Sequence, residues 1–187
     1  MPATLRFGTD RSVLLELRDG VLLAECGAPR AAPLGDPADA ATRGLAEPLD
    51  YPPLARSTTP ADRVVLPLGR DVPQAGEIVG AAVRSLVEAG VQPDGITVLR
   101  TLADAEAGIG DPRPGLPKLL RERIRVVTHD PAQRGELAYL ASTETGDPIF
   151  LNRAITDADV VLPVGCFRHR WGAGPWGIHG AVYPPFS

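Results

Sequence analysis

The residues best suited to chemistry gather near the end of the chain. Two of its three histidines, His169 and His179, stand there in a segment rich in glycine, arginine and tryptophan. An imidazole can gain or lose a proton near neutral pH, so each histidine is a candidate catalytic residue. Both could equally be surface side chains that bond backbone carbonyls. Two histidines alone are a weak metal signal, and no residue is predicted as a metal ligand.

The neighbours of these histidines suit an anionic ligand. Arg168 and Arg170 flank His169, and if the segment is extended they lie on one side of it with His169 on the other. Guanidinium groups bind carboxylates and phosphates, although both arginines could simply be solvated. Glycines let backbone N–H groups approach an anion, and a tryptophan can stack on a planar ligand or pack the loop onto a sheet. The further cofactor-binding candidates are Gly174, Gly177, Gly180 and Trp176.

A second candidate pair follows an earlier apolar run, Arg63–Leu68. Arg70 and Asp71 stand before Pro73, at the entrance to a predicted helix, where a charged pair can grip a ligand. We predict Arg70 as a cofactor-binding residue and Asp71 as a catalytic, positioning residue. In the alternative interpretation Asp71 caps the helix or pairs with Arg70. His129 and Cys166 are interpreted as structural.

The elements that position these residues alternate between strands and helices. Strands are predicted at 63–68, 96–99, 125–128 and 159–164, and a helix is predicted from the apolar face over 78–87, ending before Gly90. This order predicts an α/β fold with a mostly parallel, Rossmann-like three-layer sheet. The loops after the strands (69–73, 100–106, 128–133 and 165–181) should meet at one edge, which is the expected ligand site.

The first third of the chain has a different pattern. Short strands are predicted at 5–7, 13–17 and 21–24, with a hairpin turn at Asp19-Gly20. A Pro-rich stretch with one short helix near 38–45 follows. We therefore predict that residues 1–60 form an N-terminal β-hairpin and crossover packed on an α/β core of residues 61–187.

Composition excludes several classes of partner. The net charge of −4 does not favour nucleic acid or an anionic membrane. No apolar run approaches the length of a membrane span, and the N-terminus lacks the apolar segment of a signal peptide. Cys26 and Cys166 are far apart and form no metal or redox spacing. These features predict a cytoplasmic protein that binds neither nucleic acid nor membrane.

Three stretches give the chain a family resemblance: residues 62–73 (DRVVLPLGRDVP), 149–165 (IFLNRAITDADVVLPVG) and 173–184 (AGPWGIHGAVYP). Together with residues 50–54 (DYPPL), they make the chain resemble the N-terminal domain of the nickel-dependent lactate racemase family. The resemblance implies a nickel-pincer nucleotide that takes a hydride from the Cα of a 2-hydroxy acid and returns it to either face. It also implies two histidine bases, an Asp and an Arg after the first core strand, a tethering lysine and a nickel-ligating histidine.

The chain departs from the family pattern at several of these positions. The usual Asp-x-Thr-Arg-Pro is absent before Pro73, and Arg70 is the nearest arginine. The strand that ends near Arg100 is not followed by the family's Gly-Phe-His. Gly180 stands where the tethering lysine is expected, and Lys118, the chain's only lysine, lies in an unrelated region. The nickel-ligating histidine would fall beyond Ser187.

The resemblance therefore implies the first domain of a longer, two-domain protein. We expect a racemase or epimerase that holds the nickel-pincer nucleotide non-covalently and acts on a 2-hydroxy acid together with its own C-terminal domain. His169 or His179 would transfer the proton, Arg168 or Arg170 would bind a carboxylate or phosphate, and Asp71 would position the ligands. The missing Lys, Arg and His leave an alternative open, a non-catalytic α/β domain that binds a nucleotide or another anionic ligand.

Overall fold

The structure is a computed structural model that describes residues 2–7, 11–16, 18, 35–70, 72–166, 168–170, 174–176 and 178–187. The chain divides into two units, residues 1–33 and 34–187. In the first, β1 (Pro2–Phe7) pairs antiparallel with β2 (Arg11–Glu16), and Leu5 lies opposite Val13. The hairpin predicted between strands 13–17 and 21–24, with its turn at Asp19-Gly20, includes residues that lie outside the described ones and stays a prediction. The predicted division after residue 60 stays a prediction.

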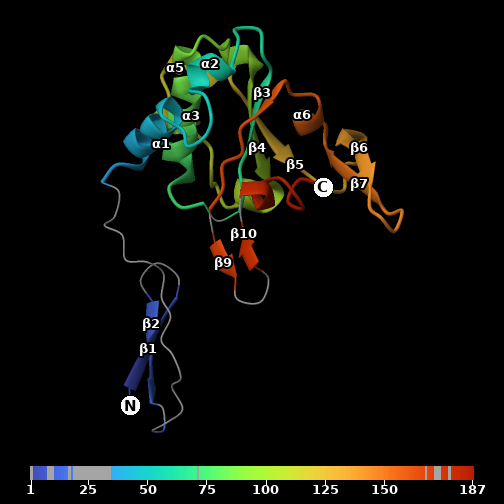
Figure 1. Cartoon of the computed structure of the whole chain (residues 1–187). Helices are drawn as coiled ribbons and strands as arrows, with labels where there is room; N and C mark the ends of the chain where they lie inside the picture. Colours follow the sequence, from blue (N-terminus) through green and yellow to red (C-terminus); the bar gives the residue numbers. More distant parts are fainter. Residues whose placement is uncertain are drawn as a thin grey trace. The chain divides into compact units, whose positions relative to one another are not determined.

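The second unit is built on a parallel sheet (Figure 1). Its strands are β3 (Val64–Pro67), β4 (Ile96–Thr101), β5 (Arg125–His129) and β8 (Val160–Val161), in the order β5-β4-β3-β8. Val65 of the central strand β3 pairs with Thr97 on one side and Val161 on the other. All four residues of β3 are buried, as expected for a strand covered on both faces. The predicted α/β fold with a mostly parallel sheet is confirmed.

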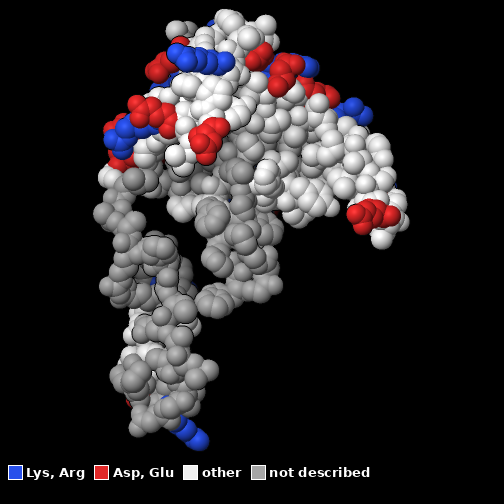
Figure 2. All heavy atoms as spheres, in the orientation of Figure 1, with Lys and Arg blue, Asp and Glu red and all other residues white. Residues whose placement is uncertain are grey.

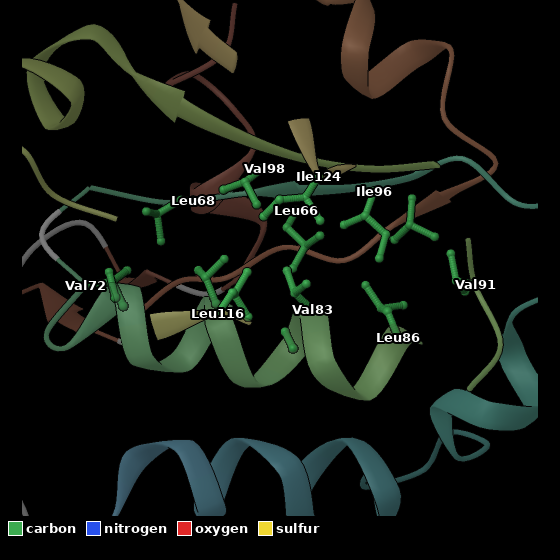
Figure 3. Packing of buried hydrophobic residues seen from close by; sticks show 14 residues of the cluster. Leu66, Leu68, Val72, Val83, Leu86, Val91, Ile96, Val98, Leu116 and Ile124 are labelled. Carbon is green, nitrogen blue, oxygen red and sulfur yellow. The ribbon is translucent and has the colours of Figure 1, made fainter. Parts of the chain in front are cut away.

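One face of the sheet packs on α3 (Ala75–Glu88). Val79, Val83 and Leu86 lie on one side of this helix and are fully buried against Leu66, Val98 and other strand residues (Figure 3). The helix ends where Gly90 adopts a φ of 101°, a conformation that suits glycine. Two further helices, α1 (Pro37–Ala46) and α2 (Leu54–Ser57), contact α3.

The opposite face has a smaller core. It consists of Val65, Leu99, Leu151, Ile155 and Phe186. Leu151 comes from the antiparallel pair β6 (Leu137–Ser142) and β7 (Pro148–Asn152), and Ile155 from α6 (Arg153–Thr156). The connecting elements are α4 (Leu102–Glu106), α5 (Lys118–Arg123), the short pair β9 (Arg168–Arg170) and β10 (Gly174–Trp176), and the 3-10 turns η1 (Pro93–Gly95), η2 (Arg113–Gly115), η3 (Arg134–Glu136) and η4 (Ile178–Ala181).

The surface of the described residues carries mixed charges. On the face that Figure 2 shows, acidic and basic side chains are interspersed over the outer helices and do not form a patch of one sign. None of the helices in the described part of the chain is long and apolar enough to cross a membrane.

Candidate functional site

The carboxyl ends of the four parallel strands lie next to one another, as the sequence predicts. Thr101 at the end of β4 pairs with His129 at the end of β5. Leu68, just after β3, pairs with Val164 after β8, and the Gly69 N–H donates to the Val164 carbonyl at 2.8 Å. The residues that follow these strands therefore share one edge of the sheet, which is where open α/β sheets bind ligands.

The C-terminal turn brings two predicted site residues to this edge. A Cβ at Gly69 would lie only 3.0 Å from the Cβ of Ala181, so Ala181 packs directly on the end of β3. His179 and Gly180 precede Ala181 in η4, and the His179 side chain is exposed. Arg70 follows Gly69 and is also exposed. The edge thus carries Arg70, His179 and Gly180 together.

Other predicted residues are described only by their backbone. β9 and β10 form an antiparallel pair in which His169 lies opposite Pro175, and the described backbone of residues 168–170 is extended. The pairing places Arg168 opposite Trp176 and Arg170 opposite Gly174. The side chains of these residues lie outside the description, as do Asp71 and Gly177 entirely. The roles assigned to all of them stay predictions.

His129 is buried at the end of β5. Its Nδ1 lies 3.1 Å from the side-chain nitrogen Nδ2 of Asn152. Its ring contacts that of Phe186 edge to face, with the ring centroids 5.7 Å apart. Burial lowers the pKa of His129. The Ser187 backbone and the negative charges of Asp130 and Glu136 act in the opposite direction, but their effect is smaller. A neutral ring that accepts at Nδ1 is the form that fits these contacts.

Asn152, which the sequence analysis did not select, links this histidine to the C-terminal turn. Its side-chain oxygen caps α6 by accepting from the Ala154 N–H at 2.9 Å, and its own N–H donates to the Phe186 carbonyl at 2.9 Å. Phe186 in turn donates to Val182, and Val182 donates to the carbonyl of His179. A chain of hydrogen bonds therefore runs from His129 to the turn that carries His179. An Asn at a strand-to-helix junction is the sequence signal for its capping role.

The end of β4 differs from what the resemblance predicts. Where a Gly-Phe-His is expected, the chain starts α4, capped by Thr101, whose hydroxyl donates to Asp104 Oδ2 at 2.6 Å. Arg100, just before it, is only 8% exposed and donates from Nη1 to the Ile109 carbonyl at 2.9 Å. Sequence reasoning missed Arg100, whose only signal is a charge inside an otherwise apolar strand.

The described residues do not form a metal centre of their own. Within the described ranges, no group of three or more His, Cys, Asp and Glu side chains could hold a metal ion. Lys118 lies on α5, before β5 begins, and pairs with Glu122 at 3.8 Å. α5 ends at Arg123, directly before the start of β5, so this helix leads into the end of the strand opposite to the candidate site. Cys166 is partly buried and packs against the larger core.

A groove lies elsewhere, near the beginnings of the strands. It has a volume of about 470 Å³ and is lined by residues that include Arg63, Gly95, Arg125 and Arg153. None of the predicted site residues lines it. Because ligands of open α/β sheets bind at the carboxyl ends of the strands, we place the candidate site at that edge and not in this groove.

Comparisons with known proteins agree with this fold. The family model of the lactate racemase N-terminal domain matches residues 7–182. The chain is similar to the solved structure of the lactate racemase apoprotein from Thermoanaerobacterium thermosaccharolyticum, with a TM-score of 0.64 and 14% sequence identity. That match covers 100% of this chain and 44% of the other, so the chain spans less than half the length of that relative. No curated protein matches the chain.

Proposed function

Because the chain belongs to the lactate racemase N-terminal domain family, we propose that it forms the first part of an enzyme that racemises or epimerises a 2-hydroxy acid. The observation that carries this proposal is the family match over residues 7–182, which spans every candidate site residue from Arg70 to Gly180. The close approach of Gly69 to Ala181, the neighbours in sequence of Arg70 and Gly180, supports it.

The described residues fit a cofactor held without a covalent bond. No lysine stands near Gly180 in the chain, while guanidinium, imidazole and backbone N–H groups at this edge suit an anionic nucleotide. When bound, a nickel-pincer nucleotide would supply the hydride acceptor and donor for the substrate Cα. The residues that would hold it are Arg70, Arg168, Arg170, Gly174, Trp176, Gly177 and Gly180.

The chain's own residues would handle the proton and the substrate's charge. His179, exposed at the edge, or His169 on β9 would take the proton of the substrate hydroxyl and return it to the oxygen. An arginine would neutralise the substrate carboxylate and so fix the position of Cα. Asp71 would position these groups.

Two measurements test the proposal. First, native and denaturing mass spectra of the chain mixed with nickel-pincer nucleotide should show a mass increase that vanishes on denaturation. Second, the protein loaded with this nucleotide should convert L-lactate or another 2-hydroxy acid labelled with deuterium at Cα into its opposite enantiomer, detected by chiral chromatography. Retention of deuterium in the product would support transfer as a hydride.

Substitutions test which residues take part in the reaction. We expect His179→Gln or His169→Gln to lower the rate of racemisation by about 10²–10⁴-fold, the usual contribution of a general base. Arg125→Gln, at the start of β5 and away from the site edge, should leave the rate unchanged. Absence of both nucleotide binding and racemisation in the folded protein would refute the proposal.

A second function is supported by the residues that depart from the family pattern. Gly180 replaces the tethering lysine, and α4 replaces the Gly-Phe-His after β4. These changes fit a non-catalytic domain that keeps an anion site. Binding of simple adenine nucleotides without binding of the pincer nucleotide would favour this alternative.

A further inference from the structure

His129 and Asn152 form a buried polar pair at the carboxyl end of the sheet, and each residue is only 2% exposed. The side-chain oxygen of Asn152 accepts from the Ala154 N–H at 2.9 Å, so the Nδ2 atom is the one that lies 3.1 Å from Nδ1 of His129. Because Nδ2 can only donate, Nδ1 accepts and the ring proton is on Nε2. These contacts select one tautomer of the neutral ring.

A second proton on this ring has no place in the closed structure. It would put an N–H at Nδ1 directly against the N–H of Asn152 Nδ2, so that two donors face each other. Turning the Asn152 amide over would direct Nδ2 at the Ala154 N–H and remove the cap of α6. Nε2 of His129 is enclosed and makes no hydrogen bond, so a buried charge would also lack a partner there.

Charged groups on the surrounding elements do not offset this cost. The groups that favour the charged ring are the Ser187 backbone, Asp130 and Glu136 of η3. Burial has the larger effect and lowers the pKa of His129. Asp104 of α4 and Arg153 of α6 have hydrogen-bond partners of their own. His129 therefore takes up a proton more readily once it leaves its enclosed position.

His129 and Asn152 also hold the C-terminal turn, residues 178–187. The backbone N–H of Asn152 donates to the Phe186 carbonyl at 2.9 Å, and the fully buried Phe186 packs edge to face on the His129 ring. Near its beginning the same turn carries His179, whose side chain is exposed. Displacement of Phe186 would therefore uncover His129 and detach the turn that carries His179.

We propose that His129 and Asn152 form a pH-sensitive switch, which holds the C-terminal turn and its His179 at the edge of the sheet near neutral pH and releases them in acid. Ala181 packs on Gly69 at the end of β3, so release of the turn would also separate this contact. Opening of the turn rests on the contacts around His129, whereas control of a racemase or epimerase by that opening rests on the proposed function.

Amide hydrogen exchange of the full chain, measured by NMR between pH 7.5 and pH 5.0, tests the opening. The Val182 N–H donates to the His179 carbonyl and the Phe186 N–H to the Val182 carbonyl, so both report on the turn. Their protection factors should fall by up to about tenfold per pH unit below about pH 6.5, because the open turn binds one more proton than the closed one. The Glu47 N–H, which donates to Arg43 at the end of α1, should not follow this dependence. Amides of β3 should stay better protected than the turn at every pH, which separates local opening from unfolding of the whole unit.

Two variants test the role of the buried pair. Asn152→Asp keeps the size of the side chain and an oxygen for the Ala154 N–H, but it gives Nδ1 of His129 an acceptor, so acid should no longer lower the protection of the turn. His129→Gln cannot take up a proton and should show the same independence of pH. Arg125→Gln, at the other end of β5, is the matched control and should keep the pH dependence of the unsubstituted protein.

Several outcomes would overturn the inference. These are protection of the turn that does not change with pH in the unsubstituted protein, an acid-induced loss of protection that persists in both folded variants, and a loss that occurs only together with that of β3. The proposed function fails separately. Racemisation by a protein whose turn stays protected in acid would refute only the switch, whereas acid-induced opening in a protein that racemises no 2-hydroxy acid would refute only the enzyme.

Discussion

His129 makes stability depend on pH at the scale of a single residue. Burial lowers its pKa in the folded protein below the ordinary value near 6.5, so the unfolded chain binds the proton more readily. The free energy of unfolding should therefore be fully retained above that ordinary value and should fall as the pH drops through it. Urea unfolding at pH 7.5 and pH 5.5 measures how much of the free energy of unfolding is lost between these pH values. The loss should be smaller in His129→Gln.

Carboxylates do not account for a loss of stability in this pH range. Asp94, Asp111 and Asp159 have a lowered pKa, chiefly through hydrogen bonds from arginines, and titrate below this pH window. The same pH dependence in His129→Gln as in the unsubstituted protein would contradict the assignment.

The positions of individual candidate residues could be predicted only where a local pattern marks them. Arg70 and His179 follow apolar runs in loops with glycine, and this pattern placed them at the strand ends. Arg100 and Asn152 are polar residues within or at the end of strands, and their burial depends on which strands pair. Pairing of β4 with β3 and β5, which join residues far apart in sequence, is what encloses Arg100.

At the scale of an element, the loop after α4 depends on Gly110. Its φ is 74°, and a Cβ there would lie 2.0 Å from Leu68 Cδ2. Gly110→Ala combines backbone strain of about 1–2 kcal/mol with an overpacking cost of about 1–3 kcal/mol, and it should lower the free energy of unfolding by their sum. Gly108 has a φ of 68° with nothing within 4 Å, so Gly108→Ala should cost the strain alone. If urea unfolding gave the same loss of free energy for both variants, the loop would have moved to make room for the methyl group at residue 110.

The helix α3 should contribute most through its buried face. Leu86 is fully buried between α3 and the sheet, so Leu86→Ala should lower the free energy of unfolding by about 2–5 kcal/mol (Figure 3). Leu119 on α5 is 76% exposed, and Leu119→Ala should cost less than about 0.5 kcal/mol. Denaturant unfolding of both variants measures the difference, and similar costs would contradict the assigned core.

Elements with a strong period of apolar residues were predicted well, whereas the bounds of strands that depend on pairing with another strand were not. The apolar face of residues 78–87 gave α3 to within a few residues, and Gly90 ended it as expected. The final strand was predicted over 159–164, but β8 contains only Val160–Val161 before a single bridge at Val164. Leu162 and Val164 still donate to the carbonyls of Val65 and Pro67, but Pro67 of β3 has no N–H to donate back to the strand, and the ladder is interrupted there.

At the scale of the whole molecule, both cores belong to the second unit. Among the described residues, every member of the larger and the smaller core lies at or after Leu45, whereas the first unit ends at residue 33. A unit with its own core can fold alone. We therefore predict that a fragment of residues 34–187 unfolds cooperatively, with a Tm within a few degrees of that of the full chain, as followed by circular dichroism. In the fragment, Phe186→Ala should cost about 3–5 kcal/mol, because this fully buried side chain anchors the turn that carries His179. Loss of the cooperative transition on removal of residues 1–33 would mean that the N-terminal unit contributes to the core.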